Sequence, residues 1–226
     1  MLFLINHFQT NQLQKLKKSY KNYQTITSKD LYLVLDSPGG SISAGKALIA
    51  YVKSLPNKVH TITMFAASMA YITAQSLDKR YITQDGEMMS HRASISGLSG
   101  QVPGEANIRL AHISRIVEEL FQSVSKRVGV SYEQYMLSVY DELWLTSADA
   151  VKLTHADEVV VVKCSKSLSG THKSLINTLF GVFEVEFSDC PLIRGPLSIS
   201  TTNAIFRNAV INELGIGFNK RMRLFL

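Results

Sequence analysis

Short apolar runs alternate along the chain with segments of helical periodicity. The run at 31–35 is continuously apolar and stops at Asp36-Ser37-Pro38-Gly39-Gly40, which is typical of a buried strand entering a tight turn. An alternating, β-branched run at 59–65 predicts a second strand. The segment 43–54 between them has helical spacing, with Ser43 as its cap. Strands and helices in this alternation predict an α/β layer structure with parallel strands.

The clearest single element is an amphipathic helix over 105–128, which Gly129 would end. Its small and apolar residues recur at helical spacing: Ile108, Ala111, Val117, Leu120, Phe121, Val124 and Val128. Weaker patterns predict strands at 2–5, 81–83, 87–91 and 159–162, a turn at Asp85-Gly86, and helices at 9–23, at 66–76, from Ser131 and at 147–153.

The pattern weakens after about residue 165, where Ser, Gly and Thr become common. We therefore expect two parts, a domain at 1–164 and a C-terminal extension at 165–226. The extension could be an appended small domain, a tail or a poorly packed segment, and its pattern does not choose among these.

Composition and charge exclude several classes of protein. The chain has 226 residues, of which 46% are hydrophobic and 19% are charged, enough to bury a core and too apolar for a disordered chain. No apolar run is long enough for a membrane span, and we expect no secretory signal at the N-terminus. The net charge is +6, but the clusters of basic residues do not belong to a recognisable nucleic-acid-binding module, so we expect no nucleic-acid partner. Two cysteines, Cys164 and Cys190, are too few for a disulfide scaffold and favour a reducing, cytoplasmic compartment.

Ser68 is the first residue that could carry chemistry. It follows a strand and two alanines and opens a helix, where free backbone N–H groups and the helix dipole stabilise negative charge. Acyl transfer needs such a position, although a helix-capping serine is the commoner explanation of one serine alone. Gly39 and Gly40 permit backbone geometry in which N–H groups face a ligand oxygen, although an ordinary turn would also use them.

A serine nucleophile needs a base, and His91 at the end of a short strand is the best-placed histidine. The base in turn needs an orienting acid. Asp141 and Glu142 stand together before the segment 143–146, and either could be that acid or a solvated surface charge. No His, Cys, Asp or Glu cluster has the spacing of a metal site, so we expect neither a metal nor another cofactor.

Four stretches, in this order, resemble the proteolytic subunit of the Clp protease, a serine peptidase family. They lie at 36–45, 66–69, 89–91 and 144–151, and the similarity covers about residues 2 to 163. Ser-Gly-Gln at 99–101 is similar to the start of the family's handle region. The resemblance implies a crotonase-like superhelix of ββα units, with the helix at 105–128 as the handle.

By this resemblance Ser68 is the nucleophile of a serine endopeptidase and His91 its general base. The backbone N–H groups of Gly40 and Met69 would form the oxyanion hole, and Gly39 and Ser41 would bind substrate. The family has an aspartate at the position of Glu142, so we expect Glu142 to be the third member of the triad, with Asp141 as the alternative.

The resemblance also implies partners. Clp proteolytic subunits assemble as two stacked heptameric rings around a closed chamber, and an ATP-driven AAA+ unfoldase supplies unfolded protein or peptide substrate. No segment before residue 2 matches the pore-lining N-terminus of the family. Two residues differ from the family pattern: Glu142 replaces an aspartate and Met64 replaces a glycine. These differences motivate a second hypothesis, in which the chain is a weakly active or inactive ring subunit that acts as a scaffold. A third is a crotonase-type enzyme acting on acyl-CoA, which would share the oxyanion hole but not need Ser68 and His91.

Overall fold

The chain divides into two compact units, residues 1–161 and residues 162–226. The computed structural model describes residues 2–5, 10–23, 30–93, 102–164, 166, 169–178, 181–190, 192–193 and 195–201. The Ser-Gly-Gln stretch at 99–101 and the end of the C-terminal part therefore lie outside the described residues.

A six-stranded mixed sheet forms the centre of the first unit. Its strands are β1 (Leu2–Ile5), β2 (Leu31–Ser37), β3 (Val59–Ala67), β4 (Arg80–Ser90), β5 (Leu143–Thr146) and β6 (Glu158–Val160). Strands β1 to β4 pair in chain order and are parallel, and β6 runs parallel to the first half of β4. The expectation of parallel strands alone is wrong for β5, which is antiparallel to β4. Leu143 pairs with Ser90, so the chain enters β5 at the carboxyl end of β4 and returns along it without a crossover.

Strand β4 is one continuous strand of 11 residues, although the sequence predicts two short strands around a turn. Gly86 does not make that turn. A Cβ atom at Gly86 would lie 2.6 Å from Ile82 Cγ1 and 2.8 Å from the carbonyl oxygen of Thr63. The glycine instead lets the backbone approach β3, where the strand register shifts between Thr63 and Phe65.

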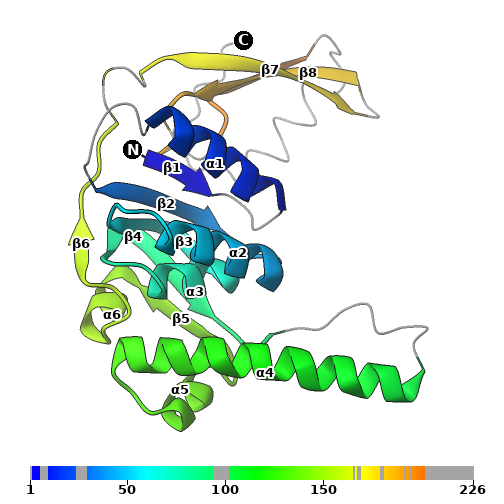
Figure 1. Ribbon diagram of the computed structural model, residues 1–226. Helices are drawn as coiled ribbons and strands as arrows, with labels where there is room; N and C mark the ends of the chain where they lie inside the picture. The colour runs from blue at the N-terminus through cyan, green and yellow to red at the C-terminus, as the bar shows by residue number, and fades with distance from the viewer. Residues whose placement is uncertain are drawn as a thin grey trace. The chain divides into compact units, whose positions relative to one another are not determined.

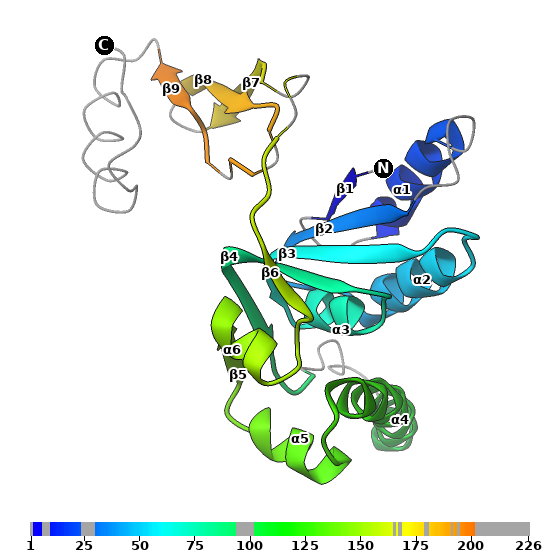
Figure 2. The same cartoon turned by 90° about the vertical axis from the view of Figure 1, so that its left-hand side faces the viewer.

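Helices cover the sheet and build the core. They are α1 (Thr10–Tyr23), α2 (Ile42–Lys53), α3 (Met69–Gln75), α4 (Pro103–Val128), α5 (Tyr132–Ser138) and α6 (Ser147–Lys152). Figures 1 and 2 show α1, α2 and α3 on the same face of the sheet. All seven residues of α3 are buried. The cap of α2 is Ser41 rather than the predicted Ser43, because Ser41 Oγ accepts a hydrogen bond from the Ala44 N–H.

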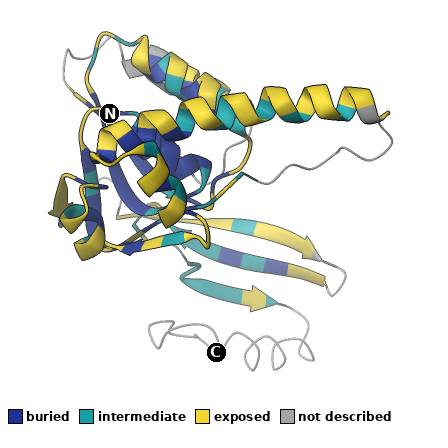
Figure 3. Ribbon diagram, turned by 90° about the horizontal axis from the view of Figure 1, so that it is seen from below, coloured by how far each residue is buried: buried dark blue, intermediate teal, exposed yellow. Residues whose placement is uncertain are grey.

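The long helix α4 ends at Gly129, as its sequence predicts, in the left-handed conformation at φ 82°. Its last turns bury Phe121, Val124 and Val128 against the core. Figure 3 shows that most of its earlier length is exposed. Among the described residues, no helix combines the length and the apolar character needed to cross a membrane.

A buried polar cluster fixes the far end of α3. The Arg80 guanidinium donates to Asp157, to Gln75 Oε1 at 2.7 Å and to the Thr154 carbonyl at 2.8 Å. His155 is buried beside it, with Nδ1 2.6 Å from the Tyr71 hydroxyl. Burial, and then the charge of Arg80, lower the pKa of His155 from 6.5 to about 4. The imidazole is therefore neutral in the folded protein near neutral pH.

This depressed pKa predicts acid sensitivity. Below pH 6.5 the unfolded chain protonates His155 while the folded chain resists protonation, so stability falls as the pH drops from 6.5 to about 4. We expect His155 to contribute about 3 kcal/mol of this loss in the free energy of unfolding. Urea unfolding of the full chain at several pH values should give a shallower pH slope for His155→Gln than for wild type. Hydrogen bonds to Arg80 lower the pKa of Asp157, and this residue contributes the same pH dependence of stability to both proteins. Identical slopes would show that His155 titrates normally.

The second unit is a small antiparallel sheet in the order β7-β8-β9, formed by β7 (Thr171–Thr178), β8 (Gly181–Ser188) and β9 (Ser198–Thr201). Phe183 and Val185 of β8 are buried. Cys164 and Cys190 form a disulfide. The cysteine count therefore no longer supports a reducing compartment, because disulfides persist in oxidising ones. The cytoplasmic location remains a prediction, which the number of cysteines no longer supports.

Candidate active site

Ser68 occupies a strained turn between β3 and α3. Its backbone has φ 57° and ψ −121°, a conformation that residues other than glycine rarely adopt. Hydrogen bonds hold it there: its N–H donates to the Met89 carbonyl at 2.9 Å, and its carbonyl accepts from the Ile72 N–H at 3.1 Å. The side chain makes no capping hydrogen bond, so the alternative of an ordinary helix cap is wrong. Strain of this kind gathers at functional sites.

Gly39 packs directly against this turn. A Cβ atom on Gly39 would lie 2.7 Å from both the Ala67 carbonyl oxygen and Ser68 Cβ. Gly39 has φ 102° and donates its N–H to Ser37 Oγ at 3.1 Å, and Gly40 follows with φ 134°. Only glycine fits at residue 39, for reasons of both space and backbone conformation.

We therefore expect Gly39→Ala to displace the turn that carries Ser68. A shift of about 1 Å at a reacting group can lower turnover about 10²-fold, which is the loss expected here. Gly129→Ala is the matched control: residue 129 also needs positive φ, but a Cβ there would meet nothing within 4 Å. Peptide hydrolysis by the two folded variants is the measurement. Equal activities of the two variants would show that contact between Gly39 and the turn does not set the position of Ser68.

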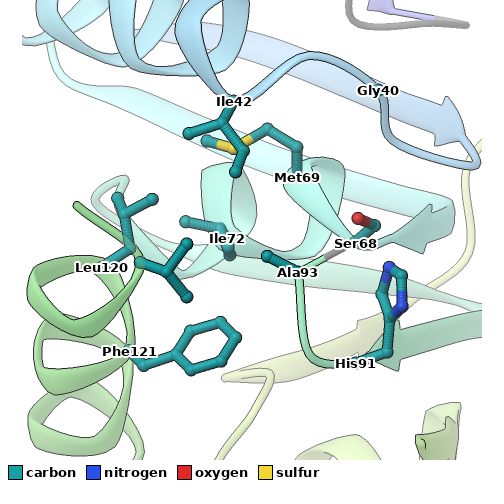
Figure 4. Close-up of a pocket in the computed structure, with 10 residues that line it drawn as sticks. Gly40, Ile42, Ser68, Met69, Ile72, His91, Ala93, Leu120 and Phe121 are labelled. Carbon is teal, nitrogen blue, oxygen red and sulfur yellow. The ribbon is translucent and has the colours of Figure 1, made fainter. Parts of the chain in front are cut away.

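A cavity of about 210 Å³ opens beside Ser68. Figure 4 shows Ser68 and His91 at one end of it and the apolar side chains of Ile42, Ile72, Leu120 and Phe121 along its wall. Val117 lines the same wall. Gly40 and Met69 also line it. Met69 is the first residue of α3, so its N–H has no partner within the helix.

The cavity brings together four of the predicted site residues: Gly40, Ser68, Met69 and His91. Neither of the two predicted substrate-binding residues lines it. Gly39 is buried beneath the turn, and Ser41 caps α2 with its hydroxyl, which also contacts Ser43 Oγ at 2.9 Å. The apolar wall was not predicted as part of a site, since the spacing of Val117, Leu120 and Phe121 reads as an ordinary core face.

His91 directly follows β4 and is half-buried. Figure 4 shows its imidazole beside the Ser68 side chain. Within the described ranges, no hydrogen bond joins the Ser68 hydroxyl to the His91 ring. Both side chains border the same cavity, and catalytic hydrogen bonds are often long or poorly aligned in a structure without substrate.

A shared cavity shows which acidic residue lies near His91. The last pair of the ladder between β4 and β5 is Ser90 with Leu143, and His91 and Glu142 are the residues just outside that pair. Glu142 and His91 both line a second cavity of about 430 Å³, whereas Asp141 does not line it. Glu142 has φ 72°, and its carboxylate accepts a hydrogen bond from Trp144 Nε1 at 3.0 Å. The Glu142 carboxylate is thus near His91 but hydrogen-bonded to the Trp144 indole.

A comparison with protein families decides what kind of protein carries this site. A family model described as Clp protease matches residues 8–163. The match spans well over half of the chain and contains Ser68, His91 and Glu142. The chain belongs to the Clp protease family. The α/β fold with a mixed sheet and the long helix α4 is consistent with the fold of Clp proteolytic subunits.

Membership in the Clp protease family makes this chain a peptidase-like protein. The family match ends at residue 163, two residues beyond the first unit. The sheet β7-β8-β9 lies beyond the matched residues. Nowhere in the described part of the chain do three His, Cys, Asp or Glu side chains gather so that they could hold a metal ion.

Proposed function

We propose that this member of the Clp protease family is a serine endopeptidase that cleaves unfolded proteins or peptides through an acyl-enzyme on Ser68. The observation that carries the proposal is the strained turn at Ser68, which opens into the same cavity as His91. A strained serine without a capping role, beside a histidine and free helix N–H groups, has the parts of a nucleophilic site.

The residues of the site divide the reaction between them. His91 removes the hydroxyl proton as Ser68 Oγ attacks the peptide carbonyl carbon, and the backbone N–H groups of Gly40 and Met69 donate to the oxyanion. His91 then gives that proton to the leaving amine, which departs as the acyl-enzyme forms. Water, deprotonated by His91, releases the acyl group. Glu142, once turned from Trp144, would orient the ring and stabilise the imidazolium.

The apolar wall of the cavity gives the proposed enzyme a preference. Ile72, Leu120 and Phe121 would receive an apolar substrate side chain next to the cleaved bond, because a charged one would lose its hydration without gaining a partner. We therefore propose unfolded or peptide substrates with large apolar residues at that position.

Covalent labelling tests the proposal directly. A fluorophosphonate probe should modify the wild-type protein at Ser68, as peptide mass spectrometry would locate, and should not modify Ser68→Ala. Ser54→Ala is the matched control, because Ser54 is an exposed serine that does not line the cavity, and it should label like wild type. A folded wild type that resists the probe would instead support the scaffold hypothesis, which the bond between Glu142 and Trp144 favours.

We further propose that the chain works as a homo-oligomer of stacked heptameric rings, served by an AAA+ unfoldase in the cytoplasm. Family membership supports this assembly, as does the exposed length of α4, which includes an Ile108 side chain that is 74% exposed. The molecular mass of the purified full chain in solution checks it, since a monomeric mass would contradict the ring.

A further inference from the structure

A buried tyrosine of α5 bonds to the strand end that carries His91. Tyr135 is 1% exposed, and its hydroxyl lies 2.6 Å from Ser90 Oγ. Ser90 is the last residue of β4, is also 1% exposed, and directly precedes His91. The direction in which the chain leaves β4 toward the base is therefore tied to the Tyr135 hydroxyl.

The same side chain reaches the other parts of the site. The Tyr135 ring meets the Phe121 ring edge-to-face, with centroids 5.4 Å apart, and Phe121 belongs to the apolar wall of the cavity. The Tyr135 side chain also interacts electrostatically with Tyr71. Tyr71 is fully buried in α3, the helix that begins just after Ser68. Tyr71 is in turn held by His155 at 2.6 Å.

These hydroxyls are hydrogen-bond donors throughout the physiological pH range. Burial raises the pKa of Tyr135 to about 12 and that of Tyr71 well above its usual value. Apolar side chains could fill the same space without any directional contact. Hydrogen bonds at buried positions constrain both distance and angle, so the bond between Tyr135 and Ser90 fixes the placement of the end of β4 relative to α5.

We propose that Tyr135 is a positioning residue: through its hydrogen bond to Ser90 and its ring contact with Phe121, it holds the His91 end of β4 in place relative to the apolar wall of the cavity. This inference rests on the proposed function of Ser68 and His91, because it describes how His91 is held in place at that site. Tyr135 itself does not line the cavity, so it would act on turnover and not on the binding of substrate.

Removal of single oxygen atoms tests the proposal. Tyr135→Phe keeps the ring contact with Phe121 and deletes the hydroxyl, and Ser90→Ala deletes its partner. We expect each variant to lower kcat for a fluorogenic peptide by about 10- to 100-fold with KM nearly unchanged, because reacting groups are misplaced. The double variant should be no slower than either single variant, since both remove one shared interaction. Ser90→Thr, which keeps a hydroxyl, should retain most of the activity.

The control is Tyr132→Phe on the same helix. The Tyr132 hydroxyl has no hydrogen bond to a described residue, and this variant should match wild type in kcat. Lower thermal stability of Tyr135→Phe with unchanged kcat would overturn the proposal and leave Tyr135 a purely structural residue. Additive losses in the double variant would also overturn it.

A readout independent of activity separates this proposal from the proposed function. Hydrogen–deuterium exchange of the segment 88–93 should become faster in Tyr135→Phe and stay at the wild-type rate in Tyr132→Phe. Faster exchange in a protein that does not react with fluorophosphonate would keep the positioning role and reject the peptidase. Unchanged exchange would reject the positioning role in an active and an inactive protein alike.

Discussion

Ser68→Ala and His91→Ala should each lower kcat for peptide hydrolysis by about 10⁶-fold, because a serine nucleophile and its base act as one unit. The double variant should be no slower than either single variant. The reason is geometric: both groups border one cavity, and neither can attack the substrate without the other. Steady-state hydrolysis of a fluorogenic peptide with an apolar residue before the cleaved bond measures the effect.

A small residual rate should survive in all three variants, since Gly40 and Met69 would still donate to the oxyanion and about 10³-fold catalysis over water can remain in such sites. His112→Ala is the matched histidine control, because His112 is an exposed residue of α4 and does not line the cavity. Substantial activity in His91→Ala, with circular dichroism showing native folding, would remove His91 as the base.

Glu142→Ala should lower kcat by up to about 10⁴-fold, the loss that accompanies removal of the orienting acid of a triad. Asp141→Ala should have little effect. The expected difference follows from position, because Glu142 and His91 lie just outside the strand pair Ser90 and Leu143 and border one cavity. Asp141 does not border that cavity. Kinetics of both variants on the same peptide, with matched folding checks, measure the contrast.

Trp144→Phe refines this second experiment. It removes the indole N–H that binds the Glu142 carboxylate at 3.0 Å, and it keeps an aromatic ring next to Phe65. If Glu142 must leave the indole to serve His91, the variant should be at least as active as wild type. Similar, small losses from Glu142→Ala and Asp141→Ala would instead mean that the site works without a third member.

Local pattern predicts much of the first unit. Strand β2 follows from a continuous apolar run, and α4 follows from apolar spacing that ends at a glycine. Strand β5 was missed because it has only four residues and includes an exposed Trp144, so no periodicity marks it. Its existence depends on hydrogen bonds to β4, which are partners distant in sequence. The prediction of two strands in place of β4 is wrong for a related reason. Gly86 is needed for the close approach of β4 to the neighbouring strand β3, and it does not form a turn.

The amino-acid sequence alone was enough to select Ser68 and His91 as candidates. Their residue types, their places after strands and the family resemblance all point to a nucleophile and a base. The sequence could not place the acid, since Asp141 and Glu142 are adjacent in sequence and only the folded structure shows that Glu142 shares a cavity with His91. Nor could it reveal the strain at Ser68 or the role proposed for Tyr135, which looks like any apolar position of a helix. Periodicity records which side of an element is buried, whereas a site is made by contacts between elements, and those exist only once the chain has packed.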